Sequence, residues 1–183
     1  MLMVAVTTTA ATAKEKGGQV FHAVVAQDGT GDYLTVQDAI DAAPVGRTEP
    51  WRIYIKEGTY KEHVDIPESK PYLSLIGEGR HKTQISCDRL CGGPTGVKVD
   101  EGATVTARSS NLFFEGINFV NSYRHQQKIC PVTGGISAGQ RWPAATTLFT
   151  QADRVVLSRC PLLSFQDTWL TPFRLPNLRW LRR

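Results

Sequence analysis

A spaced pattern of apolar residues occurs twice in the sequence and limits the possible folds more than any other feature. Residues 112–121 carry it as Leu-Phe-Phe, Ile, Phe and Asn, and residues 155–164 carry it as Val-Val-Leu, Cys, Leu and Ser, at a constant offset of 43 residues. A constant offset is typical of stacked structural repeats, and we interpret it as two coils of about 21 to 22 residues each. A β-sandwich also has short strands between turns, but it does not predict such an offset.

The apolar segments are nearly all short, rich in β-branched and aromatic residues, and followed by Gly, Asn or Asp. Strands are expected at residues 21–26, 51–55, 63–66, 72–76, 83–87, 97–99, 103–107, 111–120, 146–150 and 154–165. One helix is predicted over residues 35–43, where Thr35 can cap the first turn and Pro44 follows the end. The pattern therefore predicts an all-β chain, a right-handed parallel β-helix whose first coil is covered by this short N-terminal capping helix.

Length and composition indicate one soluble domain with distinct ends. The chain has 183 residues, and its excess of 21 Lys and Arg over 17 Asp and Glu is carried by four arginines in the last twelve residues, so no nucleic-acid or anionic membrane surface is indicated. Residues 1–20 resemble a signal remnant or a disordered N-terminus, and residues 172–183 form an atypical basic tail. No stretch approaches the roughly 18 apolar residues of a membrane helix, so no membrane span is expected.

The segment Ser-Phe-Gln-Asp-Thr-Trp-Leu-Thr at residues 164–171 places an amide and a carboxylate between aromatic rings. Neighbouring side chains of a strand point to opposite faces, so Gln166 and Asp167 can share a pocket only if the backbone turns there. In the alternative interpretation, these two are turn residues and Phe165 and Trp169 belong to the core.

Other catalytic and metal-binding patterns are missing from the sequence. No Gly-x-Ser-x-Gly motif is present, and the four histidines and four cysteines lack the spacing of a metal site, so none is expected. Any hydrolysis would have to depend on carboxylates and amides. Cys87 and Cys91 are close enough in sequence to pair if the protein is exported.

Six motifs, the last of them within residues 164–171, follow one another in a recognisable order. They are AQDGTGDYLTVQDAI at residues 26–40, IKEGTYKE at 55–62, LIGEG at 75–79, NFVN at 118–121, ADRV at 152–155 and FQDTW at 165–169. Together they resemble the motifs of the pectin methylesterases (pectinesterases), carbohydrate esterases with a parallel β-helix fold. The resemblance makes residues 21–171 the expected pectinesterase-like domain. Within the second motif, we read Gly58 to Glu62 as a turn in which the Tyr60 hydroxyl stays in water.

The resemblance implies an aspartyl esterase that converts methyl esters of galacturonan in pectin to free carboxylates and methanol, without a metal or organic cofactor. It implies a secreted or cell-envelope monomer that modifies cell walls and degrades pectin. Gln166 corresponds to an oxyanion donor, and Asp167 to the acid that protonates the departing methanol and then activates water. Since a second carboxylate attacks the ester, the two acids need different environments. From their rings alone, we expect Phe165 and Trp169 to stack on sugar.

The sequence departs from the family pattern at three points. Ala144 stands where the family has a second oxyanion glutamine, and Gln140 is not equivalent to it without a loop shift. Neither the Asp-Phe-Ile-Phe-Gly type motif, which carries the family's nucleophile, nor the Gly-Arg-Pro-Trp type motif occurs in the 183 residues. We therefore expect an incomplete β-helix, with residues 172–183 a truncated or out-of-frame end or a genuine basic tail.

Three interpretations of the function follow. The first is a pectin methylesterase chain that is inactive as it stands, because its acid has no nucleophile to assist. The second is a catalytically inert polygalacturonan-binding module that uses Phe165 and Trp169. The third is a non-functional gene fragment that does not fold stably, because residues 154–165 would leave an open apolar edge.

Overall fold

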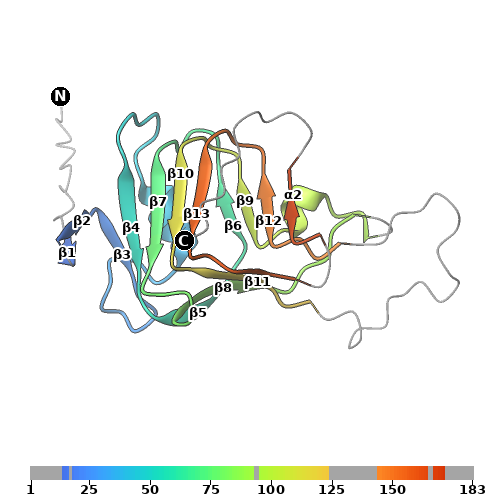
Figure 1. Cartoon of the computed structure of the whole chain (residues 1–183), viewed down its shortest axis with the longest axis horizontal. Helices are drawn as coiled ribbons and strands as arrows, with labels where there is room; N and C mark the ends of the chain where they lie inside the picture. Colours follow the sequence, from blue (N-terminus) through green and yellow to red (C-terminus); the bar gives the residue numbers. More distant parts are fainter. Residues whose placement is uncertain (1–13, 17, 93–94, 124–143, 165–166, 172–183) are drawn as a thin grey trace, which may run out of the picture.

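The computed structural model describes residues 14–16, 18–92, 95–123, 144–164 and 167–171, and three parallel sheets wind through them as a β-helix (Figure 1). The first sheet contains β3 (Ala23–Val25), β4 (Trp51–Ile55), β7 (Leu73–Gly77), β10 (Leu112–Glu115) and β13 (Val155–Ser158). The second contains β5 (Gly58–Lys61), β8 (Thr83–Cys87), β11 (Asn118–Asn121) and β14 (Leu162–Leu163). The third contains β6 (Val64–Ile66), β9 (Val105–Ala107), β12 (Leu148–Thr150) and β15 (Trp169–Leu170).

The remaining elements are small. An antiparallel pair, β1 (Lys14–Lys16) and β2 (Gln19–Phe21), precedes the coils, α1 (Val36–Ala42) follows β3, and α2 (Val99–Gly102) precedes β9. The first coil is covered by α1, which contacts β3 and β6 and buries Val36, Ala39 and Ile40 in the core. The predicted parallel β-helix with a short N-terminal helix over its first coil is therefore confirmed.

The 43-residue offset corresponds to one coil, and our interpretation as two coils is wrong. The equivalent segments pair directly, β10 with β13 and β11 with β14, so they lie in adjacent coils. The coil is long because residues 122–147 connect β11 to β12, whereas residues 62–63 alone connect β5 to β6. A repeat offset counts residues in strands and connections together, so it cannot separate one long coil from two short ones.

Two local predictions are also corrected. Residues 97–99 do not form a strand, since Val99 begins the one-turn helix α2, which the sequence analysis missed. Gly58 to Lys61 form β5 rather than a turn, because they pair in register with β8. Burial also withdraws the Tyr60 hydroxyl from water, and this group donates to the carbonyl of Lys56 at 3.1 Å. Burial raises the pKa of Tyr60 to about 12.

The interior is built from ladders of side chains in register. Ile53, Leu75, Phe114 and Leu157 occupy matching positions in four successive strands of the first sheet, and each is at most 5% exposed. Alternate residues of a strand face the same side, so one apolar position per strand is enough to continue the ladder along the axis. Burial of these layers is the main favourable contribution to folding.

The N-terminal end of α1 is held by a residue from the next coil. The predicted cap is confirmed, because the Thr35 hydroxyl accepts the N–H of Asp38 at 3.1 Å. The Glu62 carboxylate accepts the N–H groups of Val36 and Gln37, each at 2.9 Å. A seven-residue helix is too short to be stable alone, so these contacts, with its buried face, fix it in place.

Glu62 is also expected to make the free energy of unfolding fall as the pH rises, which is opposite to the usual effect of an acidic residue. Burial raises the pKa of Glu62 above its ordinary value of 4.5, and the N–H groups of Val36 and Gln37 only partly oppose this effect. The folded state therefore holds the proton more tightly than the unfolded chain. The contribution of Glu62 to stability is complete below pH 4.5 and is lost as the pH rises through the folded pKa.

We expect the wild type to gain stability relative to Glu62→Gln as the pH falls from 7 to about 4.5, because the amide cannot take up a proton. Urea unfolding of both proteins across this range measures the difference. A difference that stays constant, or shrinks towards low pH, would contradict the assignment.

The C-terminal end of α1 is held by Lys70, a buried residue of the next coil. Its ammonium donates to the carbonyl of Asp41 at 2.7 Å and to the carbonyl of Ala43. Carbonyls at a helix C-terminus lack partners within the helix, and the helix dipole favours a cation there. Lys70 and Glu62 therefore hold the two ends of α1 with charges of the favourable sign.

Replacing Lys70 with methionine is expected to lower the free energy of unfolding by about 1.5 to 3 kcal/mol, since charge-assisted hydrogen bonds to two buried carbonyls are lost. The matched control is Lys82→Met, which breaks ion pairs to Glu57 and Glu78 that lie on the surface and should cost about 1 kcal/mol or less. Urea denaturation of the two variants tests this. Equal losses would show that Lys70 does not hold the helix.

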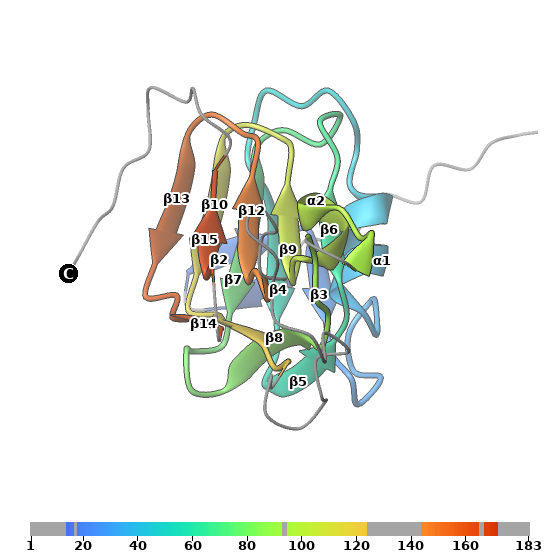
Figure 2. The same cartoon turned by 90° about the vertical axis from the view of Figure 1, so that its right-hand side faces the viewer.

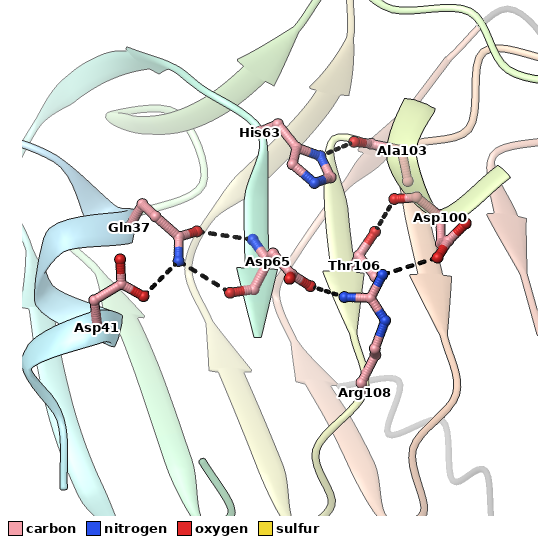
Figure 3. Close-up of polar contacts among 8 residues, drawn as sticks. All are labelled: Gln37, Asp41, His63, Asp65, Asp100, Ala103, Thr106 and Arg108. Carbon is pink, nitrogen blue, oxygen red and sulfur yellow. Dashed lines mark hydrogen bonds and ion pairs between the residues drawn. The ribbon is translucent and has the colours of Figure 1, made fainter. Parts of the chain in front are cut away.

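The open edge of the third sheet is covered by side chains (Figure 3). At this edge, the Gln37 amide accepts the N–H of Asp65 at 2.8 Å and donates to the Asp65 carbonyl at 3.1 Å, as a neighbouring strand would. Arg108 then joins the carboxylate of Asp65 to that of Asp100 and lowers the pKa of Asp100. The edge of β6 is thus not free to pair with another chain.

Candidate functional site

The connections from the second sheet to the third are residues 62–63, 88–104, 122–147 and 164–168. Their described residues stack along the axis and form one corner of the β-helix, which we call the site corner. In Figure 2, β9, β12 and β15 stand side by side above this corner. The N–H of Glu62 donates to the Ser86 carbonyl at 3.0 Å, and that of Thr147 donates to the Thr168 carbonyl at 3.2 Å. Residues from distant parts of the sequence are therefore aligned along the corner.

Asp167 lies on this corner, two residues before the start of β15. Its side chain is exposed and its backbone has a φ of 53°, a left-handed conformation that aspartate tolerates better than most residues. The turn is anchored on either side, because the hydroxyls of Ser164 and Thr168 lie 2.9 Å apart in a hydrogen bond. The left-handed backbone of Asp167 agrees with a turn at this residue, and its carboxylate is exposed to solvent.

Two predicted site residues cannot be placed. Phe165 and Gln166 lie outside the described residues, and so does Gln140. The roles of Gln166 as oxyanion donor and of Phe165 as a sugar-stacking ring stay predictions.

Trp169 faces the interior of the coil. It pairs in register with the core residue Leu148, packs partly against the core, and donates its indole N–H to the Thr150 hydroxyl at 3.1 Å. This position agrees with the alternative interpretation in which Trp169 belongs to the core. Its role in sugar stacking stays a prediction, and a Trp169→Ala variant would alter packing as well as any binding surface.

Ala144 is buried at the site corner, where the resemblance calls for a glutamine. Its N–H donates to the Cys91 carbonyl at 2.7 Å, and the N–H of Cys91 donates back at 2.9 Å. The methyl group of Ala144 supplies no hydrogen-bond donor. In the family mechanism, an oxyanion at this corner would have one side-chain hydrogen-bond donor fewer than in a protein with glutamine at this position.

Asn121 is a structural residue of the corner that the sequence analysis did not identify as such. Its side chain is 3% exposed and donates to the carbonyls of Arg89 and Thr146, at 2.9 and 3.0 Å. It therefore ties two long connections together. The repeat gave the only indication in the sequence, because Asn121 occupies the repeat position that Ser164 occupies 43 residues later.

Cys87 and Cys91, which are close enough in sequence to pair in an exported protein, are both free thiols in the structure. The Cys87 sulfur lies 3.3 Å from the Thr104 hydroxyl, whereas the Cys91 thiol donates to the Ala144 carbonyl at 3.4 Å. Burial raises the pKa of Cys87, so this thiol is a poor nucleophile near neutral pH.

The described part of the chain shows neither a metal-binding cluster nor a membrane-spanning helix. Among these residues, no group of three or more His, Cys, Asp or Glu side chains is arranged to hold a metal ion. No helix found there has the length and apolar character needed to cross a membrane.

Fold and site together define a parallel β-helix protein that presents a carboxylate at the start of a strand in its last described coil. Within that class, the chain belongs to the pectinesterase family, whose model matches residues 22–173.

Individual relatives agree with this assignment. The chain is 35% identical over 148 residues to a pectinesterase of Petunia integrifolia, covering 80% of this chain and 35% of the relative. It is 37% identical over 149 residues to pectinesterase 1 of Solanum lycopersicum, covering 81% of this chain and 24% of the relative. The chain thus spans about a third or less of these relatives.

Solved structures show the same fold. Pectin methylesterase from carrot matches with a TM-score of 0.69 and 29% identity, over 85% of this chain and 43% of that chain. A pectin methylesterase in complex with a hexasaccharide matches with a TM-score of 0.68 and 27% identity, over 84% of this chain and 46% of that chain. The prediction of a right-handed parallel β-helix is thereby confirmed.

Proposed function

We propose that the chain carries the acid and oxyanion side of a pectin methylesterase site, which acts on methyl-esterified galacturonan. The observation that carries the proposal is the exposed Asp167 on an anchored left-handed turn, within a Gln-Asp-Thr segment of a pectinesterase β-helix. A related pectin methylesterase that has been solved with a hexasaccharide supports an oligosaccharide as the ligand.

In the proposed reaction, a nucleophilic carboxylate that the 183 residues do not supply attacks the ester carbonyl and forms the acyl intermediate, while the Asp167 carboxyl gives its proton to the departing methoxide, which leaves as methanol. The resulting carboxylate then takes a proton from water, which attacks the acyl intermediate. A positioned acid and base of this kind contributes roughly 10²- to 10⁴-fold to the rate. Gln166 would donate to the oxyanion, and the missing donor at Ala144 would cost about 2.7 to 4 kcal/mol of transition-state stabilisation.

The 183 residues contain no Asp-Phe-Ile-Phe-Gly type motif, so this chain by itself supplies no matching nucleophile. We therefore propose that it binds the polymer without turning it over. We also propose that the protein is secreted or located at the cell envelope, because its substrate is a polymer of the cell wall, and that it acts as a monomer.

Binding of a fully methyl-esterified hexagalacturonide to the ¹⁵N-labelled chain tests the proposal. Saturable shifts are expected at the amides of Ser164, Asp167 and Thr168, with little change in the first sheet, for example at Ser74. The Asp167→Asn substitution should change the chemical shifts of the neighbouring amides in the bound state. The rest of the spectrum should remain that of the folded protein. Shifts centred on another face, or an absence of binding, would contradict the proposal.

A further inference from the structure

One buried residue of the preceding coil, Thr147, holds the chain on both sides of Asp167. The Thr147 hydroxyl donates to the Leu163 carbonyl at 2.7 Å, before the turn at Asp167. The backbone N–H of Thr147 donates to the Thr168 carbonyl at 3.2 Å, after that turn. A single residue therefore joins the two ends of the segment that carries the candidate acid.

Thr147 is itself a rigid support. Its side chain is fully buried, and it directly precedes β12, which lies beside β15 in Figure 2. The next residue, Leu148, belongs to the core and donates its N–H to the same Thr168 carbonyl at 3.0 Å. A side chain that is both packed and hydrogen-bonded in this way can fix the position of the groups that it contacts.

The same contact occurs one coil earlier. Thr104 is also fully buried, and its hydroxyl donates to the Val120 carbonyl at 3.0 Å. Thr104 and Thr147 are 43 residues apart, and so are Val120 and Leu163, which pair in register. The repeat thus carries this hydrogen bond as well as the apolar pattern. In the last described coil, the bond falls next to the segment that carries Asp167.

The position of the Asp167 carboxylate depends on its backbone. Among the described residues, none donates a hydrogen bond to this carboxylate, and the side chain is exposed. The bond between the hydroxyls of Ser164 and Thr168 lies within the segment, so it can move together with the segment. The contacts of Thr147, by contrast, tie the segment to the preceding coil.

We propose that Thr147 is a positioning residue for Asp167. Loss of its hydroxyl would release one end of the segment, and the carboxylate would then sample several positions. A misplacement of about 1 Å in an active site can lower the rate about 100-fold. The importance of this position for a reaction rests on the function proposed above, whereas the order of the Asp167 backbone rests on the contacts of Thr147.

Measurement of ¹⁵N relaxation in the full chain tests this inference. In the wild type, the amide of Asp167 should have an order parameter of about 0.85, as a rigid backbone does. Thr147→Val keeps the shape of the side chain but removes the hydroxyl, and it should lower this order parameter below about 0.6. Thr147→Ser keeps the hydroxyl and should have the wild-type value.

Thr104→Val is the matched control, because it removes the equivalent bond to Val120 one coil earlier. Both valine variants should lose similar stability in urea, but only Thr147→Val should lower the order of Asp167. The Kd for the fully methyl-esterified hexagalacturonide should rise roughly two- to tenfold in Thr147→Val and by less than about twofold in Thr147→Ser. If Thr147→Val does not fold, Thr147→Cys, whose thiol is a weaker donor, takes its place with the same expectations.

An order parameter of Asp167 that stays high in Thr147→Val would overturn the inference. An equal fall in Thr104→Val, a failure of Thr147→Ser to keep the wild-type value, or an unchanged Kd in Thr147→Val would overturn it as well. If the hexagalacturonide does not bind the wild type but the order parameters follow the expected pattern, the proposed function alone is contradicted, and Thr147 still positions the Asp167 backbone.

Discussion

Replacing Phe114 with alanine is expected to lower the free energy of unfolding by about 3 to 5 kcal/mol. The Phe114 ring is fully buried on the inner face of β10, in register with Leu75 and Leu157 of the adjacent coils. It meets Phe119 edge-on, with ring centroids 5.7 Å apart and planes inclined at 69°. The variant loses this aromatic pair and leaves a cavity between two coils that cannot collapse without shifting their backbones.

Phe113→Ala is the matched control for this prediction. It removes the same side chain from the preceding residue of the same strand, on the outer face, where Phe113 is only partly buried. A loss of about 1 kcal/mol is expected for this variant. Urea unfolding followed by circular dichroism measures both. Equal losses for the two variants would contradict the assignment of inner and outer faces.

Much of the fold could be predicted because the local sequence and the tertiary structure favour the same elements. The strands over Trp51–Ile55 and Thr83–Cys87 match their predicted limits, and the Thr35 cap marks the start of α1. Coil length could not be predicted, because the repeat offset does not separate the residues of the strands from those of the connections, such as residues 122–147 between β11 and β12. The one-turn helix α2 has no amphipathic period long enough to recognise.

The candidate site could be predicted only in part. The turn at Asp167 followed from a local argument, since adjacent side chains of a strand cannot share a face. The inward position of Trp169 depends on its register with Leu148, which no local pattern fixes. Hydrogen bonds between residues far apart in the sequence could not be predicted either. One example is the bond that the N–H of Val36 donates to the Glu62 carboxylate, 26 residues away.

Asp167 is expected to be essential once a nucleophile is supplied. Residues 1–171 can be joined to the segment that follows the Gln-Asp-Thr motif in a pectinesterase that carries the family's Asp-Phe-Ile-Phe-Gly type motif, so that the β-helix continues into that motif. Asp167→Asn in this fusion keeps the shape of the side chain but cannot exchange a proton in the reaction. General acid–base catalysis contributes roughly 10²- to 10⁴-fold, and we expect a loss of that size.

Methanol release from fully methyl-esterified galacturonan by this fusion is the most direct test of the role of Asp167. We expect steady release by the fusion and background release by the 183-residue chain. We also expect a loss of at least about 10²-fold in the Asp167→Asn fusion, with little change in a Glu57→Gln fusion, which removes a charge at another corner. Undiminished release from the Asp167→Asn fusion would contradict the proposed role of Asp167. Release from the 183-residue chain that Asp167→Asn abolished would contradict the proposed need for a further nucleophile.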